Sequence, residues 1–142
     1  MSKSILLHIG TTKTGTTSIQ HSLARAHRNG DLGPVLYPLW QRDNNQQRLA
    51  VLHFRPEELG VLLPSLRERY PSAEWKFKRM REEYRELLFG ELRSADKAII
   101  SAEMLSHLFT PRHAARLRED LATLGFKDFH IVLYVRDPAG HY

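Results

Sequence analysis

The sequence predicts an α/β fold, with a mostly parallel sheet flanked by helices, in a single domain over residues 1–142. Three short apolar runs carry this prediction, because each is long enough for a buried strand and too short for a helix. The runs cover residues 5–9, 98–100 and 129–135. Segments with helical periodicity separate them, and strands that alternate with helices are typical of parallel sheets with right-handed crossovers.

The first run leads into a loop and then a helix. It breaks at Gly10, and the next eight residues, TTKTGTTS, contain a second glycine, one lysine, five threonines and a serine. Helical spacing then predicts a helix over 16–28 that ends at Asn29-Gly30. Glycines let the backbone approach an anion closely, and the first amides of a helix have no partner within it. This unit is therefore typical of a phosphate site.

The loop nearly matches the nucleotide-binding pattern G-x-x-x-x-G-K-[ST]. Gly10 and Gly15 have the spacing of that pattern, but Thr16 stands at the position of its lysine. The lysine of this loop is Lys13, two residues before the second glycine. We expect its side chain to reach over the loop from the crown instead of rising from the first turn of the helix.

The segment LLHIGTTKTGTTSIQ resembles the 5′-phosphosulfate-binding loop of sulfotransferases that use 3′-phosphoadenosine-5′-phosphosulfate (PAPS). The core of that family's motif is K-T-G-T-T, and Lys13 to Thr17 match it. The resemblance implies a P-loop-like three-layer fold and transfer of a sulfuryl group from PAPS to a hydroxyl or amine of a small-molecule or carbohydrate acceptor. Lys13 would stabilise the charge that builds on the bridging oxygen. The residues that would hold PAPS here are Gly10, Thr11, Thr12, Lys13, Thr14, Gly15, Thr16, Thr17 and Ser18.

The middle of the chain predicts one long helix among shorter pieces. A short strand over 35–37 is cut by Pro38, and short helical pieces are expected at 49–53 and 57–63. The long helix covers about 73–92, with an inward stripe of Phe77, Met80, Tyr84, Leu87, Leu88 and Leu92. Its charged run, RMREEYRE, indicates a solvated face with local ion pairs, for instance between Glu82 and Arg85.

The last third of the chain predicts a helix over 111–124 and then a strand over 129–135. Thr110-Pro111 reads as a cap and first helical position, and Gly125 closes the helix. The strand is expected inside the sheet, because FHIVLYV is apolar on both faces apart from His130. Asp137-Pro138 then begins a helix that the sequence does not continue. This predicts a truncated domain, with an apolar patch exposed near the strand that promotes self-association.

Three predicted strands end in residues with useful chemistry, and ligands bind beyond the carboxyl ends of open parallel sheets. The three ends lead into the Gly10 loop, into Ser101 and Glu103, and into Arg136. The segment YVRDP resembles the start of the family's 3′-phosphate site, which would assign Arg136 to that phosphate. The candidates for the general base are Glu103 and His53. Glu103 could instead orient the loop lysine or a helix end, and His53 could be a packing residue; His8 reads as a core histidine.

The composition of the chain limits its possible cofactors, partners and location. The chain has 21 basic and 16 acidic residues, a formal charge of +5, which suits a polyanionic cofactor or simply a charged surface. It has no cysteine, no run long enough for a membrane span and no histidine and carboxylate spacing typical of a metal site, and it lacks the basic and aromatic pattern of nucleic-acid binding. We therefore predict a cytoplasmic protein without membrane or nucleic-acid partners.

Two other functions remain open. One is a different P-loop enzyme, a kinase or NTPase, which Thr16 at the lysine position and the lack of a clear Asp-ended strand for Mg²⁺ disfavour. The other is a non-catalytic fragment that binds a nucleotide weakly, which the predicted truncation favours.

Overall fold

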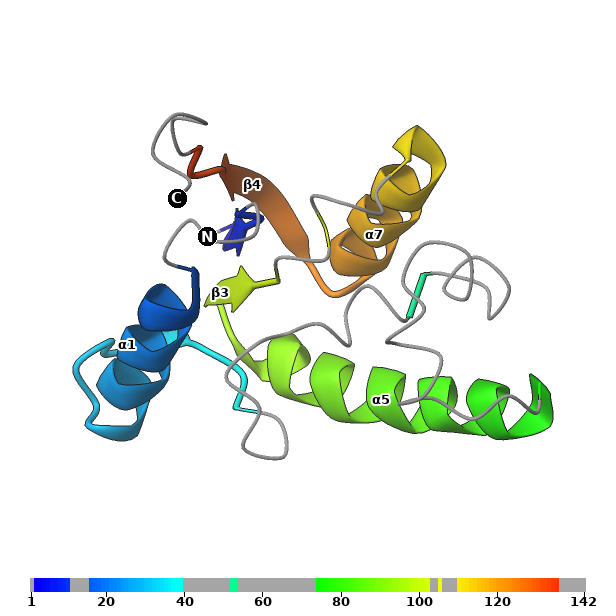
Figure 1. Ribbon diagram of the computed structural model, residues 1–142, viewed down its shortest axis with the longest axis horizontal. Helices are drawn as coiled ribbons and strands as arrows, with labels where there is room; N and C mark the ends of the chain where they lie inside the picture. Colours follow the sequence, from blue (N-terminus) through cyan, green and yellow to red (C-terminus); the bar gives the residue numbers. More distant parts are fainter. Residues whose placement is uncertain are drawn as a thin grey trace, which may run out of the picture.

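The computed structural model describes residues 2–10, 16–39, 52–53, 74–102, 105 and 110–135 (Figure 1). Within this part of the chain the fold is α/β. The elements, in chain order, are β1 (Lys3–His8), α1 (Thr16–Arg28), β2 (Val35–Leu36), α5 (Glu74–Ser94), β3 (Lys97–Ser101), α7 (Pro111–Thr123) and β4 (Phe126–Val132). The predicted helical pieces at 49–53 and 57–63 lie outside the described residues, except for Leu52 and His53, which form a turn.

The described strands form one all-parallel sheet in the order β2-β3-β1-β4. The prediction of a parallel sheet is therefore confirmed. β1 lies in the interior of the sheet, with β3 and β4 on its two sides. The register pairs His8 with Ser101 of β3 and with Val132 of β4, so that these three strands end at the same level.

Helices cover both faces of this sheet. The connection from β1 through α1 to β2 crosses the sheet in one direction, and the connection from β3 through α7 to β4 crosses it in the other. Right-handed crossovers in opposite directions place their helices on opposite faces. Figure 1 accordingly shows α1 and α7 on different sides of the strands. The direction in which the connections cross the sheet thus changes between the adjacent strands β1 and β3. In open parallel sheets, ligands bind beyond the carboxyl ends of the strands at such a point.

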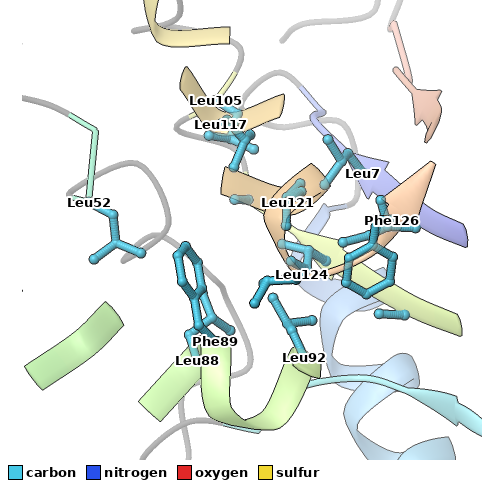
Figure 2. Packing of buried hydrophobic residues seen from close by; sticks show 14 of the residues in the cluster. Leu7, Leu52, Leu88, Phe89, Leu92, Leu105, Leu117, Leu121, Leu124 and Phe126 are labelled. Carbon is cyan, nitrogen blue, oxygen red and sulfur yellow. The ribbon is translucent and has the colours of Figure 1, made fainter. Parts of the chain in front are cut away.

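The main apolar core fills the face that α5 and α7 cover. Leu7 of β1 and its pairing partner Ile100 of β3 both belong to this core. Figure 2 shows Leu7 beside Leu117 and Leu121 of α7. The cluster consists of Ile5, Leu7, Leu52, Phe77, Leu88, Phe89, Leu92, Ala98, Ile100, Ala102, Leu105, Leu117, Leu121, Leu124 and Phe126. Because residues of β1 and β3 are packed in this core, the carboxyl ends of these two strands are held in place.

Local signals place the ends of α1 and α7. α1 runs over Thr16–Arg28 as predicted, and Gly30 has the left-handed φ of 78°. Thr110 caps α7, and His113 completes a capping box by accepting from the Thr110 backbone amide with Nδ1 at 3.4 Å. Gly125 ends α7 with a φ of 99°. These predictions are confirmed.

The position of β4 corrects the sequence-based prediction. The strand covers Phe126–Val132 instead of 129–135, and in the described part of the chain it forms an edge of the sheet. The physical reason is the turn at Gly125, which leads directly into the strand and brings the polar residues Lys127, Asp128 and His130 into it. Ile131, Leu133 and Val135 are instead exposed, at 65%, 48% and 76%.

The buried side of α5 also differs from the predicted stripe. Leu87 is 51% exposed, while Phe89 is buried in its place. Beside this buried side, the guanidinium groups of the half-buried Arg81 and of the exposed Arg85 lie over the rings of Phe77 and Phe89. Long arginine stems can cover apolar surface in this way while their charges stay wet. The predicted local ion pairs are confirmed by Arg79 and Glu83, which lie one helical turn apart at 3.3 Å, but in place of the expected pair with Glu82, Arg85 pairs with Asp120 of α7, at 2.6 Å.

No helix in the described ranges is long and apolar enough to cross a membrane.

Candidate functional site

The candidate site lies where β1, β3 and β4 end together. The Ile9 amide donates to the Val132 carbonyl at 2.9 Å, and the Ala102 amide donates to the His8 carbonyl at 3.0 Å. These bonds hold the backbone that enters the Gly10 loop between the ends of the two neighbouring strands. The chain therefore leaves β1 in the middle of the carboxyl edge of the sheet. This agrees with the prediction that the strand ends lie close together.

The structure describes part of the predicted phosphate site. Gly10 is buried at the end of β1, Thr16 begins α1, and the side chains of Thr17 and Ser18 are exposed in its first turn. The predicted site residues outside the described residues are Thr11, Thr12, Lys13, Thr14, Gly15, Glu103 and Arg136. Their roles stay predictions.

A buried polar cluster joins α1 to the ends of β1 and β3. His8 Nδ1 is 2.7 Å from Ser101 Oγ, and Gln20 Nε2 donates to the same hydroxyl at 3.0 Å. The three residues are 0–3% exposed and come from β1, β3 and α1. Side-chain hydrogen bonds thus join the first turns of α1 to two adjacent strands at the edge where the loop begins.

Only part of this cluster was predicted from the sequence. Ser101 was expected at the end of a strand and His8 in the core, but Gln20 was not predicted. Ile19 and Leu23, the large apolar residues of α1, are only partly buried, while Gln20 and Ala24 are buried. The sequence signal for this buried side of α1 was the spacing of Gln20 and Ala24, which are four residues apart and so lie on the same side of a helix.

The surroundings of His8 favour the neutral form of its ring. Burial lowers the pKa of His8 below its ordinary value of 6.5. Its ring also lies edge-on to Tyr134, with ring centroids 5.4 Å apart. Nε2 is buried and has no hydrogen-bond partner.

This lowered pKa predicts a loss of stability in mild acid. The unfolded ring binds a proton near pH 6.5, while the folded ring resists it, so unfolding takes up a proton as pH falls through that range. The free energy of unfolding should therefore decrease as pH falls from 6.5 toward the lowered pKa of the folded ring. Urea unfolding between about pH 8 and pH 5 measures it. A His8→Asn variant should show a smaller decrease; an equal decrease would assign the effect to other groups.

His53, a predicted candidate for the general base, lies in a different cluster. His53 Nε2 is 2.8 Å from Asp120 Oδ2, and Arg85 holds the other oxygen of that carboxylate. They line a cavity of about 430 Å³ between α5 and α7 together with Leu52, Lys78, Arg81, Glu82, Arg116 and Glu119.

The position of this cluster separates it from the loop. Asp120 lies one helical turn before Leu124, whose carbonyl accepts from Lys3 Nζ at 3.1 Å, and Lys3 begins β1. Figure 1 shows the 52–53 segment away from the tips of the strand arrows. The structure thus places His53 toward the end of the sheet opposite the Gly10 loop.

The described residues contain no group of three or more histidine, aspartate and glutamate side chains that could hold a metal ion. Comparison of the chain with protein-family models, with curated proteins and with solved structures finds no match in any of the three.

Proposed function

We propose that the chain transfers a sulfuryl group from PAPS to an acceptor hydroxyl or amine, on a P-loop-like fold. The observation that supports this most is the location of the K-T-G-T-T segment. In the sequence it follows the interior strand β1 of an all-parallel sheet, and its last two residues, Thr16 and Thr17, begin α1. Free amides at a helix start favour a phosphate there, and the lysine before Gly15 adds a cation.

The chemistry assigned to this edge needs a cation and a base. Sulfuryl transfer breaks the bond between sulfur and the bridging oxygen of PAPS while the acceptor oxygen or nitrogen bonds to sulfur. Adenosine 3′,5′-bisphosphate leaves with the electron pair, and Lys13 would stabilise its charge. The base would take the acceptor's proton.

Glu103 is the better candidate for this base. It follows Ser101, the last residue of β3, by two positions, and Ser101 lies beside His8 at the carboxyl edge. His53 lies toward the opposite end of the sheet, bound to Asp120. In this proposal His53 is a packing residue, which was its alternative interpretation from the sequence.

Calorimetry with three ligands tests the proposal. We expect adenosine 3′,5′-bisphosphate to bind more tightly than 5′-AMP, and ATP with Mg²⁺ to bind weakly. Tighter binding of ATP with Mg²⁺ would indicate a kinase or NTPase instead. Absence of binding by all three would support the non-catalytic alternative.

A variant of Arg136 makes this test residue-specific. Arg136 follows the end of β4, which lies next to β1, by four positions. A hydrogen bond to a charged group contributes about 1.5–3 kcal/mol, so Arg136→Ala should weaken binding of the bisphosphate by about 10-fold or more and leave 5′-AMP nearly unchanged. Arg28→Ala, an exposed arginine in the last turn of α1, is the matched control. Equal losses for both ligands would remove Arg136 from the 3′-phosphate.

A further inference from the structure

A groove lies between α7 and the edge strand β4. We call it the α7–β4 groove; Leu117 and Leu121 of α7 and Phe129 and Ile131 of β4 are among its lining residues. Its volume is about 690 Å³. Small-molecule sites commonly have volumes of about 300–1,000 Å³ and a mostly apolar lining with a few polar groups. The groove shares no described lining residue with the cavity of His53, so it is a separate feature of the fold.

The apolar part of the groove follows from the packing of α7 on the sheet. Leu7 of β1 and Leu121 of α7 are buried and close the bottom of the groove (Figure 2). The register places Ile131 of β4 beside Leu7, but Ile131 is 65% exposed. On α7 the groove is lined near its start by Ala114 and Ala115, whose side chains are small. Apolar surface therefore remains open between the helix and the strand.

Two cations line the same groove. The guanidinium carbon of Arg118, on α7, is 5.9 Å from the centre of the Phe129 ring, so this charge lies beside the apolar lining. Lys127 lies where the pairing of β4 with β1 shifts its register, and such irregularities redirect side chains. Both cations are on exposed residues with long apolar stems. A ligand in the groove would thus contact apolar groups and positive charge together.

Within the described part of the chain, no carboxylate neutralises these two cations. The described lining of the groove contains no acidic residue, and the ion pairs found there involve neither Arg118 nor Lys127. The carboxylates of α7, Glu119 and Asp120, line the other cavity, which lies toward α5. Asp128, the neighbour of Lys127, accepts a hydrogen bond from a serine hydroxyl at 2.7 Å. The charge of the groove is therefore complementary to an anion.

We propose that the α7–β4 groove binds a small amphipathic organic anion. Its apolar body packs between Leu117, Phe129 and Ile131, and its carboxylate or sulfonate group pairs with Arg118 and Lys127. Burial of the apolar body contributes affinity, while the charge-assisted bonds select an anion over a neutral molecule of the same shape. This site goes beyond the proposed sulfuryl transfer and does not depend on it.

Three probes with the same apolar body test the charge preference. They are 2-naphthoate, 2-naphthalenemethanol and 2-naphthylmethylammonium, which are an anion, a neutral molecule and a cation at pH 7. In calorimetry we expect naphthoate to bind about 10-fold or more tightly than the alcohol, as a hydrogen bond to a charged group provides, and the ammonium to bind most weakly. Equal affinities for the anion and the alcohol, or no binding of naphthoate, would overturn the proposal.

Substitutions of the two cations make the test residue-specific. Arg118→Gln and Lys127→Gln should each weaken naphthoate binding by about 10-fold and leave binding of the alcohol nearly unchanged. The matched controls are Arg116→Gln, which removes an exposed arginine of α7 that lines the other cavity, and Lys97→Gln, which removes an exposed lysine at the start of β3. Equal weakening by the controls would mean that only the net charge attracts the anion, which contradicts a site in the groove.

A substitution that fills the groove tests where the probes bind. Ala115→Phe places a ring at the lining, so it should weaken binding of both naphthoate and the alcohol by about 10-fold or more. Ala122→Phe adds the same ring to α7 at an exposed position outside the described lining and should leave binding unchanged. Thermal midpoints report whether either variant disturbs the fold. Unchanged binding by Ala115→Phe would refute the location.

Backbone amide signals of the unaltered chain make the result independent of variant folding. Naphthoate should cause its largest shifts over residues 114–118 and 127–131. Largest shifts over residues 78–85 would place the ligand in the other cavity and overturn the proposal. Shifts in the groove that appear as the protein concentration rises, without a response to naphthoate, would assign the groove to a second copy of the chain and also overturn it. None of these measurements involves PAPS, so the proposed function is tested separately.

Discussion

Lys13→Ala should reduce sulfuryl transfer by about 100-fold or more while leaving the fold intact. Loss of a single group that stabilises developing charge commonly costs about 10²–10³ in kcat. Lys13 is the one lysine of the K-T-G-T-T segment between β1 and α1, and the proposed reaction places a growing negative charge beside that loop. The rate is measured as release of adenosine 3′,5′-bisphosphate from PAPS in the presence of hydroxyl and amine acceptors.

A second lysine provides the control. Lys97 is exposed at the first position of β3, at the opposite end of the sheet from the loop. Lys97→Ala changes the net charge by the same amount, so it should keep the rate of the unaltered chain. Both variants should unfold at urea concentrations close to that of the unaltered chain. Near-normal turnover by Lys13→Ala would remove the loop from the chemistry and with it the proposed sulfotransferase activity.

Sequence patterns predicted the elements whose ends depend on local interactions. α1 and α7 begin and end close to their expected positions, because Thr110 caps one helix and Gly30 and Gly125 end the two with positive φ. Such signals act between residues that are near in sequence. The parallel sheet followed from the alternation of apolar runs and helices.

Features that depend on distant partners were not predicted. The edge position of β4 is set by which strand pairs with β1, and no local pattern in FHIVLYV encodes that choice. Arg85 pairs with Asp120, which is 35 residues away in the sequence. The spacing rule used for ion pairs considers only residues of one helix, and it therefore predicted Glu82 as the partner. Both errors came from treating one element in isolation.

In the candidate site, too, the features set by local sequence were predicted and those set by distant partners were not. The loop and the strand ends were predicted from a contiguous motif and from the rule for parallel sheets. The His8, Ser101 and Gln20 cluster requires the register that pairs β1 with β3 and the rotation of α1 over both strands. His53 was a candidate by residue type alone, and tertiary packing places it beside Asp120 instead.

Phe126→Ala should be among the most destabilising single substitutions, costing about 3–5 kcal/mol in the free energy of unfolding. Phe126 is fully buried at the start of β4, in the cluster with Leu121 and Leu124 of the α7 end (Figure 2). Lys3 Nζ also lies 5.1 Å from the centre of its ring. Truncation removes the ring from the place where β4 joins β1 and α7, and the strand there cannot collapse to fill the space because its backbone is paired with β1. This loss is a large share of the stability of a typical domain.

Urea unfolding of Phe126→Ala measures the loss, with Val135→Ala as its control. Val135 is 76% exposed just beyond the same strand, so its truncation should change the free energy of unfolding by less than about 0.5 kcal/mol. Phe126→Leu should fall between them, because it retains much of the buried apolar volume. A cost below about 1 kcal/mol for Phe126→Ala at an unchanged urea slope would mean that the core does not close around β4. The parallel pairing that brings Val132 beside His8 would then lose its main support.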